Sequence, residues 1–438
     1  MLELNIERLA YGGDAIAHLD DGRTVFVKGA CPGDRVAAEI TDDRDRFARA
    51  RVIDVISPSA SRVKPGCPYF GSCGGCAWQH VSIDAQLSAK RDIVVDALVR
   101  IGRLPHVEPL VRPTVAPSQP YGYRNKIELV CDPASRRLDL GFHRQGSDEV
   151  VPIDACPLLP KRAEKAPKAL TGALRYLAGQ SDLGLRRVSV RVASATRDLE
   201  IALWTEPGPF QRAAAAKLLS AAVPATSIVR VLAKGPQKER RVAGVEVLSG
   251  KGAWREQLNG MSFAISAPSF FQVNTPGAEA LIGLVLDSLA LDGTDRVVDL
   301  FAGAGTFTLP LAQVAGDVVA VESASSAVRD LRRNLEHAGV WADVVGGDAA
   351  REIVGLGRFD ALVVDPPRAG LDAAVIAALG SAKPRVVTYV SCDPATLARD
   401  AARLVEVGYS LTDATPVDLF PQTYHVETVA RFERGPGA

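Results

Sequence analysis

The last third of the chain alternates short apolar runs with longer stretches whose apolar residues recur at helical spacing. The apolar runs predict buried strands at residues 296–301, 317–321, 344–346, 359–364 and 385–390. Strands that alternate with helices in this way form a parallel, doubly wound sheet. We therefore expect a Rossmann-like α/β domain over residues 263–438.

Residues 1–57 follow another pattern, in which short β-type runs are separated by turns such as 20–22 and 31–34. Several short strands at regular spacing predict a small β-barrel of the OB type. We expect this barrel over residues 1–58, followed by a linker around residues 57–61. Barrels of this kind often bind RNA, and a rigid appendage is the alternative role.

Residues 59–262 mix strands and helices, which predicts a central α+β domain. Ser82 is the expected N-cap of a helix that ends at Gly102. The apolar face of this helix is expected to carry Leu87, Val94, Leu98 and Ile101.

The formal net charge is zero over 438 residues, but the charges are unevenly distributed. Residues 1–59 carry 8 Lys and Arg against 11 Asp and Glu, residues 60–262 carry 30 against 18, and residues 263–438 carry 13 against 22. The basic middle, including the loop at 234–241, indicates contact with a polyanion. A solvated basic face is the alternative.

No apolar run reaches membrane-spanning length, and the first five residues resemble no signal peptide. We therefore expect a cytoplasmic protein that does not enter membranes. Seven cysteines in a chain of this length do not indicate a disulfide scaffold, so short cysteine spacings favour metal binding or catalysis.

Three cysteines, Cys67, Cys73 and Cys76, have the spacing C-x5-C-x2-C, and Cys156 lies far downstream. The intervening glycines allow the backbone to fold tightly around a metal centre, and thiolates suit both zinc and iron–sulfur clusters. The spacing fits either metal. Cys31 and Cys131 have no such pattern and are expected in the core.

The first strand of the α/β domain runs into the loop 302–307, which has a G-x-G sequence. Glu322 ends the second strand, where a carboxylate can accept hydrogen bonds from ribose hydroxyls. Asp348 ends the third and is expected to face an adenine. These residues favour an adenosyl ligand without phosphates; NAD and a plain structural turn are the alternatives.

Cys392 follows the strand at 385–390 and precedes a helix-like run at 395–407. Ligands bind at the carboxyl edge of such sheets, so this thiol is a candidate nucleophile, and an inert buried cysteine is the alternative. Asp365 precedes two prolines that stiffen its loop, and its carboxylate suits an imide N–H such as uracil N3. Glu427 is a candidate general base, with His425 as its rival.

Together these motifs resemble those of the uracil-5-methyltransferase family that acts on tRNA and 23S rRNA. The resemblance runs essentially from end to end of the chain. It includes a TRAM-like N-terminal barrel and the cysteine set, and its other motifs are 271–274, 299–305, 365–368, 391–394 and 425–427.

The resemblance implies S-adenosylmethionine as methyl donor and a [4Fe–4S] cluster held by the four cysteines. It also implies that Cys392 adds to C6 of uracil and that Glu427 removes the C5 proton. The residues expected to hold the cofactor or orient the ring are Gln272, Phe301, Glu322, Asp348 and Asp365. The residues expected to stack on displaced bases are Phe271, Tyr121 and Tyr123.

The cluster favours 23S rRNA as substrate, with tRNA as the alternative, and we expect a monomer. A non-catalytic RNA-binding factor would need the basic middle but neither Cys392 nor Glu427. Cytosine C5 methylation would place a Pro-Cys nucleophile after the fourth strand, where this chain has Asp-Pro-Pro.

Overall fold

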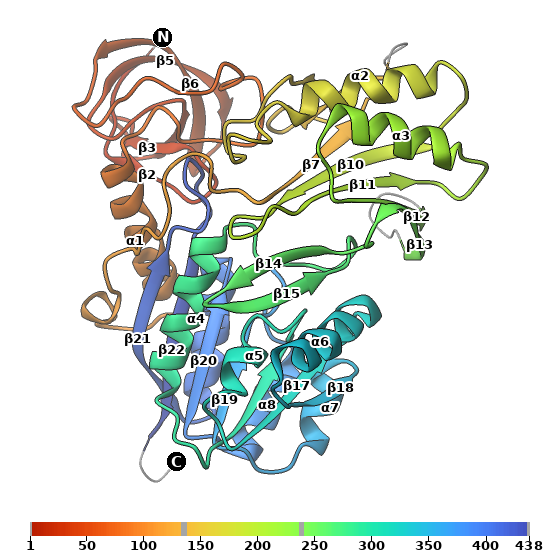
Figure 1. Ribbon diagram of the computed structural model, residues 1–438. Coiled ribbons are helices and arrows are strands. Elements are labelled where there is room, and N and C mark those ends of the chain that lie inside the picture. The colour runs from red at the N-terminus through yellow and green to blue at the C-terminus, as the bar shows by residue number, and fades with distance from the viewer. Residues whose placement is uncertain (1, 133–137, 236–240, 436–438) are drawn as a thin grey trace. The chain divides into compact units, whose positions relative to one another are not determined.

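The computed structural model describes residues 2–132, 138–235 and 241–435 (Figure 1). Residues 236–240 of the expected basic loop lie outside the described residues. The contacts divide the chain into two units. The first comprises Met1–Pro120, Pro367–Leu371 and Tyr389–Ala438, and the second comprises Tyr121–Pro366 and Asp372–Thr388. The domain boundaries near residues 58 and 262 stay predictions. Among the described residues, no helix combines the length and apolar content that crossing a membrane requires.

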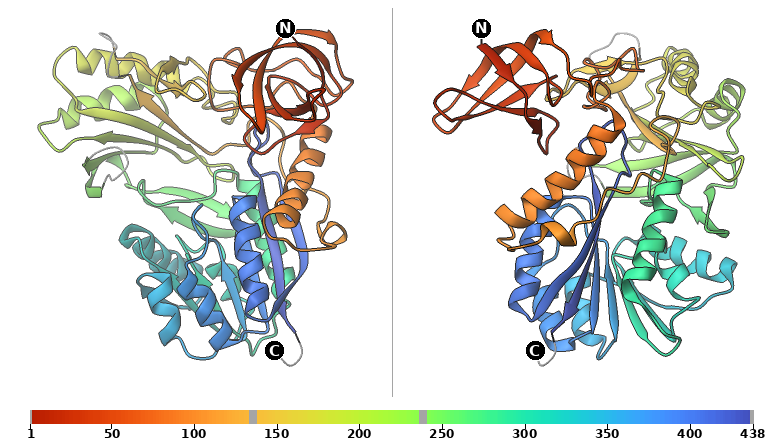
Figure 2. Two further views of the ribbon diagram at one scale, coloured as in Figure 1. Left: turned by 180° about the vertical axis from the view of Figure 1, so that it is seen from behind. Right: turned by 90° about the vertical axis from the view of Figure 1, so that its left-hand side faces the viewer.

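The first unit begins with the six-stranded barrel that the sequence predicts (Figure 2). Its strands are β1 (Leu2–Asn5), β2 (Arg8–Leu9), β3 (Ala15–His18), β4 (Thr24–Lys28), β5 (Arg35–Asp43) and β6 (Phe47–Ser57), in the order β1-β5-β6-β4-β3-β2. Trp78, from the segment after the barrel, is fully buried in its core and donates from Nε1 to the Gly13 carbonyl at 3.0 Å. The barrel core therefore includes chain beyond the expected boundary.

Helix α1 (Ile83–Arg100) begins as expected, because the Ser82 hydroxyl accepts a hydrogen bond from the Ala85 N–H. Val94 and Leu98 are fully buried as expected, but the rest of the buried face differs from the prediction. Ile101 is 49% exposed, whereas Gln86 and Lys90 are fully buried. Both polar side chains have partners in the segment 418–422, which explains why they can be buried. A short 3-10 helix, η1 (Glu108–Leu110), follows.

The first unit also contains the C-terminal part of the chain. The end of strand β20 (Val386–Ser391) is followed by α9 (Pro394–Glu406), β21 (Tyr409–Val417) and β22 (Glu427–Arg434). These strands have the order β20-β22-β21, and β22 is antiparallel to β21.

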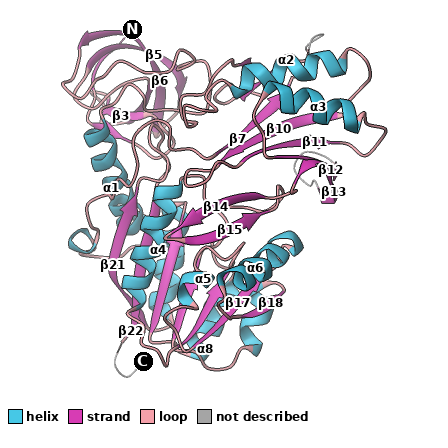
Figure 3. Ribbon diagram, viewed as in Figure 1, coloured by secondary structure: helices cyan, strands magenta, loops and turns pink. Residues whose placement is uncertain are grey.

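The second unit contains a seven-stranded sheet with the order β13-β12-β11-β10-β7-β8-β9. Helices α2 and α3 lie side by side on one of its faces (Figure 3). The elements are β7 (Lys126–Cys131), β8 (Leu140–His143), β9 (Val150–Pro152), α2 (Ala166–Ala178), β10 (Leu185–Val192), β11 (Leu199–Thr205), α3 (Arg212–Ala222), β12 (Ser227–Lys234) and β13 (Arg241–Gly250).

The remainder of the second unit is the predicted α/β sheet, whose strands there have the order β18-β17-β16-β19-β20. The pairs β18–β17, β17–β16 and β16–β19 are parallel. A hairpin, β14 (Trp254–Leu258) and β15 (Met261–Ile265), precedes it. The elements of this α/β part are α4 (Thr275–Leu289), β16 (Arg296–Leu300), α5 (Thr308–Leu311), β17 (Asp317–Glu322), α6 (Ser325–Ala338), β18 (Asp343–Gly346), α7 (Ala349–Glu352), η2 (Ile353–Gly355), β19 (Ala361–Val364) and α8 (Ala373–Ala382). The five expected strands are all present.

Candidate functional site

The loop after β16 is held in shape by Glu322 at the end of β17. The Glu322 carboxylate accepts hydrogen bonds from the Gly303 N–H at 2.9 Å and from the Ala324 N–H at 2.6 Å. Phe301 has a φ of 65°, a left-handed conformation that costs a non-glycine residue about 1–3 kcal/mol. A side chain at Gly305 would place its Cβ 2.5 Å from Leu309 Cδ1, so the loop packs closely on α5.

Asp299, the fourth residue of β16, is fully buried below this loop. Its Oδ2 accepts a hydrogen bond of 2.5 Å from the Thr308 hydroxyl, and its Oδ1 has no hydrogen-bond partner among the described residues. Burial raises the pKa of Asp299 to about 7; the Thr308 hydrogen bond opposes this, and the charges of Asp365 and Glu322 add to it. Asp299 belongs to the motif at 299–305, but the sequence alone indicated no role for it.

Asp365 follows β19, the neighbour of β16 in the sheet. Burial raises its pKa to about 7, opposed by a hydrogen bond of 3.3 Å from the Gln272 side-chain amide. Asn125 donates from Nδ2 to the Gln272 carbonyl at 3.0 Å, and Asn274 caps α4. Gln272 is therefore fixed on both sides, with its amide directed at Asp365.

Asp299, Glu322 and Asp365 thus gather near the carboxyl edge of one parallel sheet. Such an edge is where α/β sheets bind ligands. The charges that raise the pKa of Asp299 are those of the two other carboxylates. Buried carboxylates need an opposite charge or a hydrogen-bond donor. This edge therefore suits a ligand that carries a positive charge.

Asp348 lies two residues beyond β18, not at its end as expected from the sequence. It is the N-cap of α7, and its Oδ1 accepts hydrogen bonds from the Ala350 and Arg351 N–H groups. One carboxylate oxygen is therefore engaged in capping the helix.

Phe271 is only 3% exposed and packs against Trp254 and Phe263 with ring centroids 5.6 Å apart in each pair. Tyr123 is also buried, at 4%. Neither ring is available for stacking on a base in this structure, which corrects the expectation for both. The adjacent Phe270 is 65% exposed, and no pattern in the sequence singled it out.

Cys392 lies in the first unit, between the end of β20 and the start of α9. Asp393 caps α9 and accepts a hydrogen bond from the Thr396 N–H at 2.9 Å. Cys392 is partly exposed and directly precedes this cap. The positive end of a helix dipole favours a thiolate, so this location suits a nucleophile.

The loop of Cys392 also has a contact with the barrel. The Tyr11 hydroxyl donates to Asp393 Oδ2 at 3.1 Å. The Tyr11 ring lies edge-on to Tyr424, whose ring in turn stacks 4.3 Å from that of His425. Tyr11 therefore connects the loop of Cys392 with the segment that leads to Glu427, a link that the sequence did not indicate.

Glu427 is the first residue of β22 and pairs with Val417, the last residue of β21. Because α9 links β20 to β21 as a β-α-β crossover, β21 is expected to run parallel to β20. The Val417–Glu427 end of the pair then lies at the carboxyl edge of the sheet, where Cys392 is found. Glu427 is only 4% exposed, unlike most lone acidic residues in strands.

Cys67, Cys73 and Cys76 belong to the first unit and Cys156 to the second. The Cys73 sulfur accepts a hydrogen bond from the Gly75 N–H at 3.4 Å, a contact typical of ligating thiolates. Within the described part of the chain, no group of three or more His, Cys, Asp or Glu side chains is arranged to hold a metal ion. The cluster therefore stays a prediction. Cys31 is buried in the barrel core as expected, whereas Cys131 is only partly buried.

Comparison with known families gives three matches along the chain. Residues 1–53 match the TRAM domain, and residues 354–434 match the family described as tRNA (Uracil-5-)-methyltransferase. Residues 277–380 match the methyltransferase small domain. The second match includes Asp365, Cys392 and Glu427.

Similar sequences cover nearly the whole chain. An uncharacterized RNA methyltransferase of Thermosynechococcus vestitus is 36% identical over 98% of this chain and 97% of its own length. Another from Halalkalibacterium halodurans is 35% identical over 99% of this chain and 97% of its own.

Among solved structures, the Pyrococcus abyssi tRNA (uracil-54, C5)-methyltransferase in complex with S-adenosyl-L-homocysteine is similar to this chain. It is 26% identical, with a TM-score of 0.75 over 98% of this chain and 100% of its own.

Proposed function

Because the chain belongs to the RNA uracil-5-methyltransferase family, we propose that it methylates C5 of one uridine in RNA through a covalent bond between Cys392 and C6. The observation that carries the proposal is the location of Cys392, directly before the capped N-terminus of α9 and inside the matched family region. A non-catalytic RNA-binding factor would not need a thiol at that point.

We propose S-adenosylmethionine as methyl donor, since the Pyrococcus relative was solved with S-adenosyl-L-homocysteine. When bound, this donor supplies a methyl group on a positively charged sulfur. The buried, unpartnered oxygen of Asp299 and the raised pKa of Asp365 fit a cationic ligand at the edge of β16 and β19. The residues that would hold it are Gln272, Phe301, Glu322, Asp348 and Asp365, together with Asp299.

The low reactivity of carbon 5 explains why the reaction needs a thiol. Carbon 5 of uracil is a poor nucleophile until a group adds at C6. The Cys392 thiolate would form the S–C6 bond, and the electrons of the C5–C6 double bond would move onto C5 and the O4 enolate. Carbon 5 would then attack the methyl carbon of the donor, and the methyl–sulfur bond would break with its electron pair staying on sulfur, so that S-adenosyl-L-homocysteine leaves. The cysteine sulfur suits the addition at C6 because it both adds and leaves readily.

The second half of the reaction restores the C5–C6 double bond of the uracil ring. Glu427 would take the proton from C5, the electrons of that C–H bond would re-form the C5–C6 double bond, and the S–C6 bond would break to release the Cys392 thiolate. The burial of Glu427 supports this role, because a desolvated carboxylate is a stronger base than an exposed one. His425 is the rival base. Asp365 and Gln272 would orient the ring or the donor.

The finer assignments follow from the family resemblance. We propose a [4Fe–4S] cluster on Cys67, Cys73, Cys76 and Cys156, supported by their spacing and by the N–H···S bond at Cys73. We propose 23S rRNA as the substrate, because the cluster resembles that of rRNA-modifying members. The alternative is tRNA, which is favoured by the similarity to a tRNA (uracil-54, C5)-methyltransferase from Pyrococcus abyssi.

The test uses total RNA from a strain that lacks the gene, incubated with the protein and methyl-labelled S-adenosylmethionine. Label in 5-methyluridine, recovered after nuclease digestion, supports the proposal, and separating 23S rRNA from tRNA beforehand decides the substrate. A Cys392→Ser variant should lose turnover entirely. Full methylation by that variant would refute the covalent route, and label in 5-methylcytidine would refute uracil as the target.

A further inference from the structure

The loop that carries Cys392 is held by hydrogen bonds on both sides of the cysteine. The Ser391 hydroxyl donates to the Asp393 carbonyl at 3.0 Å and accepts from the Asp393 N–H at 3.2 Å. One carboxylate oxygen of Asp393, Oδ1, accepts from the Thr396 N–H at 2.9 Å and from the Thr396 hydroxyl at 3.1 Å. These local contacts use one of the two carboxylate oxygens. The orientation of the other oxygen, Oδ2, therefore depends on a partner from elsewhere in the chain.

That partner is Tyr11, in the turn between β2 and β3 of the barrel. Its hydroxyl donates to Asp393 Oδ2 at 3.1 Å, across 382 residues of sequence. Burial raises the pKa of Tyr11 and the charge of Asp393 adds to this, so the hydroxyl keeps its proton and remains a donor. A hydrogen bond to a carboxylate is stronger than one between neutral groups. Tyr11 therefore holds the oxygen that the cap of α9 does not use.

The turn that carries Tyr11 is itself anchored in the first unit. The Gly13 carbonyl accepts from Nε1 of Trp78, which is fully buried in the barrel core. A Cβ at Gly13 would lie 3.0 Å from Ala77 Cβ and 3.1 Å from Tyr424 Cδ1, so the turn packs closely on both. The Tyr11 ring meets the Tyr424 ring edge-on, with centroids 5.4 Å apart. This support matters because a mobile tyrosine would not restrict the position of its partner.

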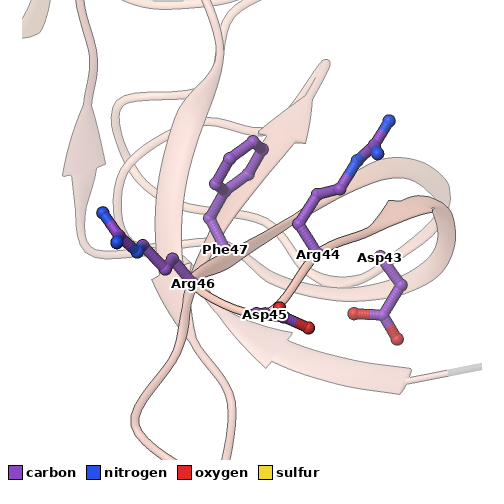
Figure 4. A pocket seen from close by; sticks show the side chains of 5 residues that line it. All are labelled: Asp43, Arg44, Asp45, Arg46 and Phe47. Atoms are coloured by element: carbon purple, nitrogen blue, oxygen red, sulfur yellow. The ribbon is translucent and has the colours of Figure 1, made fainter.

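The loop between β5 and β6 offers another part of the same barrel for comparison. The residues that line a pocket there (Figure 4) are Asp43, Arg44, Asp45, Arg46 and Phe47. Arg44 is 64% exposed and pairs through Nε with the neighbouring Asp42 at 2.8 Å. A change at Arg44 therefore alters the surface of the barrel and leaves the contact between Tyr11 and Asp393 in place.

We propose that Tyr11 is a positioning residue for methyl transfer, whose hydrogen bond to Asp393 holds the loop of Cys392 in the orientation from which the thiolate attacks C6 of uracil. The inference rests on the proposed function for the reaction at Cys392. It gives the barrel a task in catalysis that is separate from any contact with RNA, because Tyr11 acts through Asp393 and not on the reacting atoms. Displacing a reacting group by about 1 Å can cost roughly a hundredfold in rate, so a loosened loop should slow the reaction measurably.

The test is a Tyr11→Phe variant, which removes the hydroxyl and keeps the ring against Tyr424. The assay uses S-adenosylmethionine and RNA from the strain that lacks the gene. The variant should lower kcat about fivefold, the effect of one hydrogen bond, and keep the KM values for RNA and donor within about twofold. An unchanged kcat would overturn the proposal, and so would a raised KM for RNA at unchanged kcat, because Tyr11 would then contact the RNA instead.

Two controls separate the hydroxyl from general damage. Tyr176→Phe makes the same chemical change at a tyrosine of α2 that is 62% exposed. Arg44→Ala changes the barrel at the loop between β5 and β6. Both variants should keep the kcat of the unaltered protein. A fall in kcat as large as that of Tyr11→Phe in either control would overturn the proposal.

A double-mutant cycle decides whether Tyr11 acts through Asp393. Asp393→Ser keeps a good N-cap for α9 but lacks the second oxygen that the Tyr11 hydroxyl contacts. In this background Tyr11→Phe should cause no further loss of kcat, because the hydrogen bond is already gone. An equal loss in both backgrounds would show that Tyr11 acts through another group, against the proposal.

Hydrogen exchange of the protein alone, followed by mass spectrometry, needs neither RNA nor donor. The backbone amides of residues 392–397 should exchange about fivefold faster in Tyr11→Phe than in the unaltered protein, and at the unaltered rate in Tyr176→Phe. Faster exchange in a protein that methylates no RNA would mean that the proposed function fails alone. Equal exchange and equal kcat in a protein that does methylate uridine would mean that the positioning role fails alone.

Discussion

Lys90 of α1 donates a hydrogen bond of 2.5 Å from Nζ to Oδ1 of Asp418, and both side chains are buried. Lys90 also donates to the Phe420 carbonyl at 3.1 Å. Next to it, Gln86 donates to Gln422 Oε1 at 3.0 Å and accepts from the Gln422 N–H at 2.9 Å. Helix α1 therefore fixes the segment that leads to His425 and Glu427, and so orients the candidate base.

Removing only one partner of this pair should destabilise the protein. In a Lys90→Met variant, Asp418 is left buried without its cation, which typically costs about 3–5 kcal/mol. The expected result is a large fall in the free energy of unfolding by urea. A Lys90→Met/Asp418→Leu variant removes both charges and should recover most of that loss. A double variant less stable than the single one would contradict this account.

A Glu427→Gln variant should accumulate a covalent adduct between protein and RNA. Its Cys392 can still add to C6, and C5 can still take the methyl group, but the C5 proton stays in place and the thiolate is not expelled. The measurement is a denaturing gel of protein incubated with S-adenosylmethionine and radiolabelled RNA, read for a slowly migrating band.

The control for that experiment is Cys392→Ala/Glu427→Gln, which should form no adduct. Comparison with His425→Gln decides between the rival bases. If only the histidine variant traps the adduct, the base is His425, and if neither does, water or another group removes the proton.

Apart from the end of β18, the sequence predicted the strand ends well because each is a local feature. Glu322 does end β17 and Cys392 does follow β20, since β-branched runs, glycines and capping residues mark those points. The buried face of α1 was less predictable. Lys90 and Gln86 are polar and would ordinarily face water, and only their partners more than 300 residues away in sequence allow their burial.

Contacts with distant parts of the chain also limit what can be predicted for single residues next to the site. Phe270 and Phe271 are adjacent and have no strand or helix periodicity around them, so the pattern does not indicate which ring is buried. Whether Asp299 Oδ1 has a hydrogen-bond partner is decided by residues distant in sequence. The hydrogen bond from Tyr11 to Asp393 likewise joins residues that are far apart in the chain. These features come from long-range packing, which composition and spacing do not encode.

Binding of S-adenosylmethionine should release protons near neutral pH. Asp299 and Asp365 both have a pKa raised to about 7, chiefly by burial, so a fraction of each is protonated at pH 7. A positively charged sulfonium nearby favours the ionised form and displaces those protons. Calorimetric titration in phosphate and in Tris should therefore give different apparent heats, because the two buffers differ in their heat of protonation.

S-adenosylhomocysteine, which has no sulfonium charge, is the matched ligand and should release fewer protons than the donor. An Asp299→Asn variant should also release fewer. Equal proton release by the two ligands would show that the charge on sulfur does not act on these carboxylates.

The same carboxylates should make the folded protein less stable as pH rises. Their folded pKa of about 7 lies above the usual value of 3.8, so the protonated form is favoured in the folded state. Their stabilising contribution is complete below pH 3.8 and is lost as pH rises to about 7. Asp299→Asn should therefore raise the Tm at pH 8 relative to the unaltered protein, and by less at pH 5. A gain that is equal at the two pH values would contradict this reading.

Iron content tests the cysteine set directly. After anaerobic purification the protein should be brown and contain about four iron atoms per chain, the content of one [4Fe–4S] cluster. A Cys156→Ser variant should lose most of that iron, because the remote fourth thiolate is then missing. Cys131→Ser is the matched control, since Cys131 is a partly buried cysteine outside the spacing motif, and it should keep its iron. Stoichiometric zinc without iron would replace the cluster with a zinc site, and unchanged iron in Cys156→Ser would exclude that residue as a ligand.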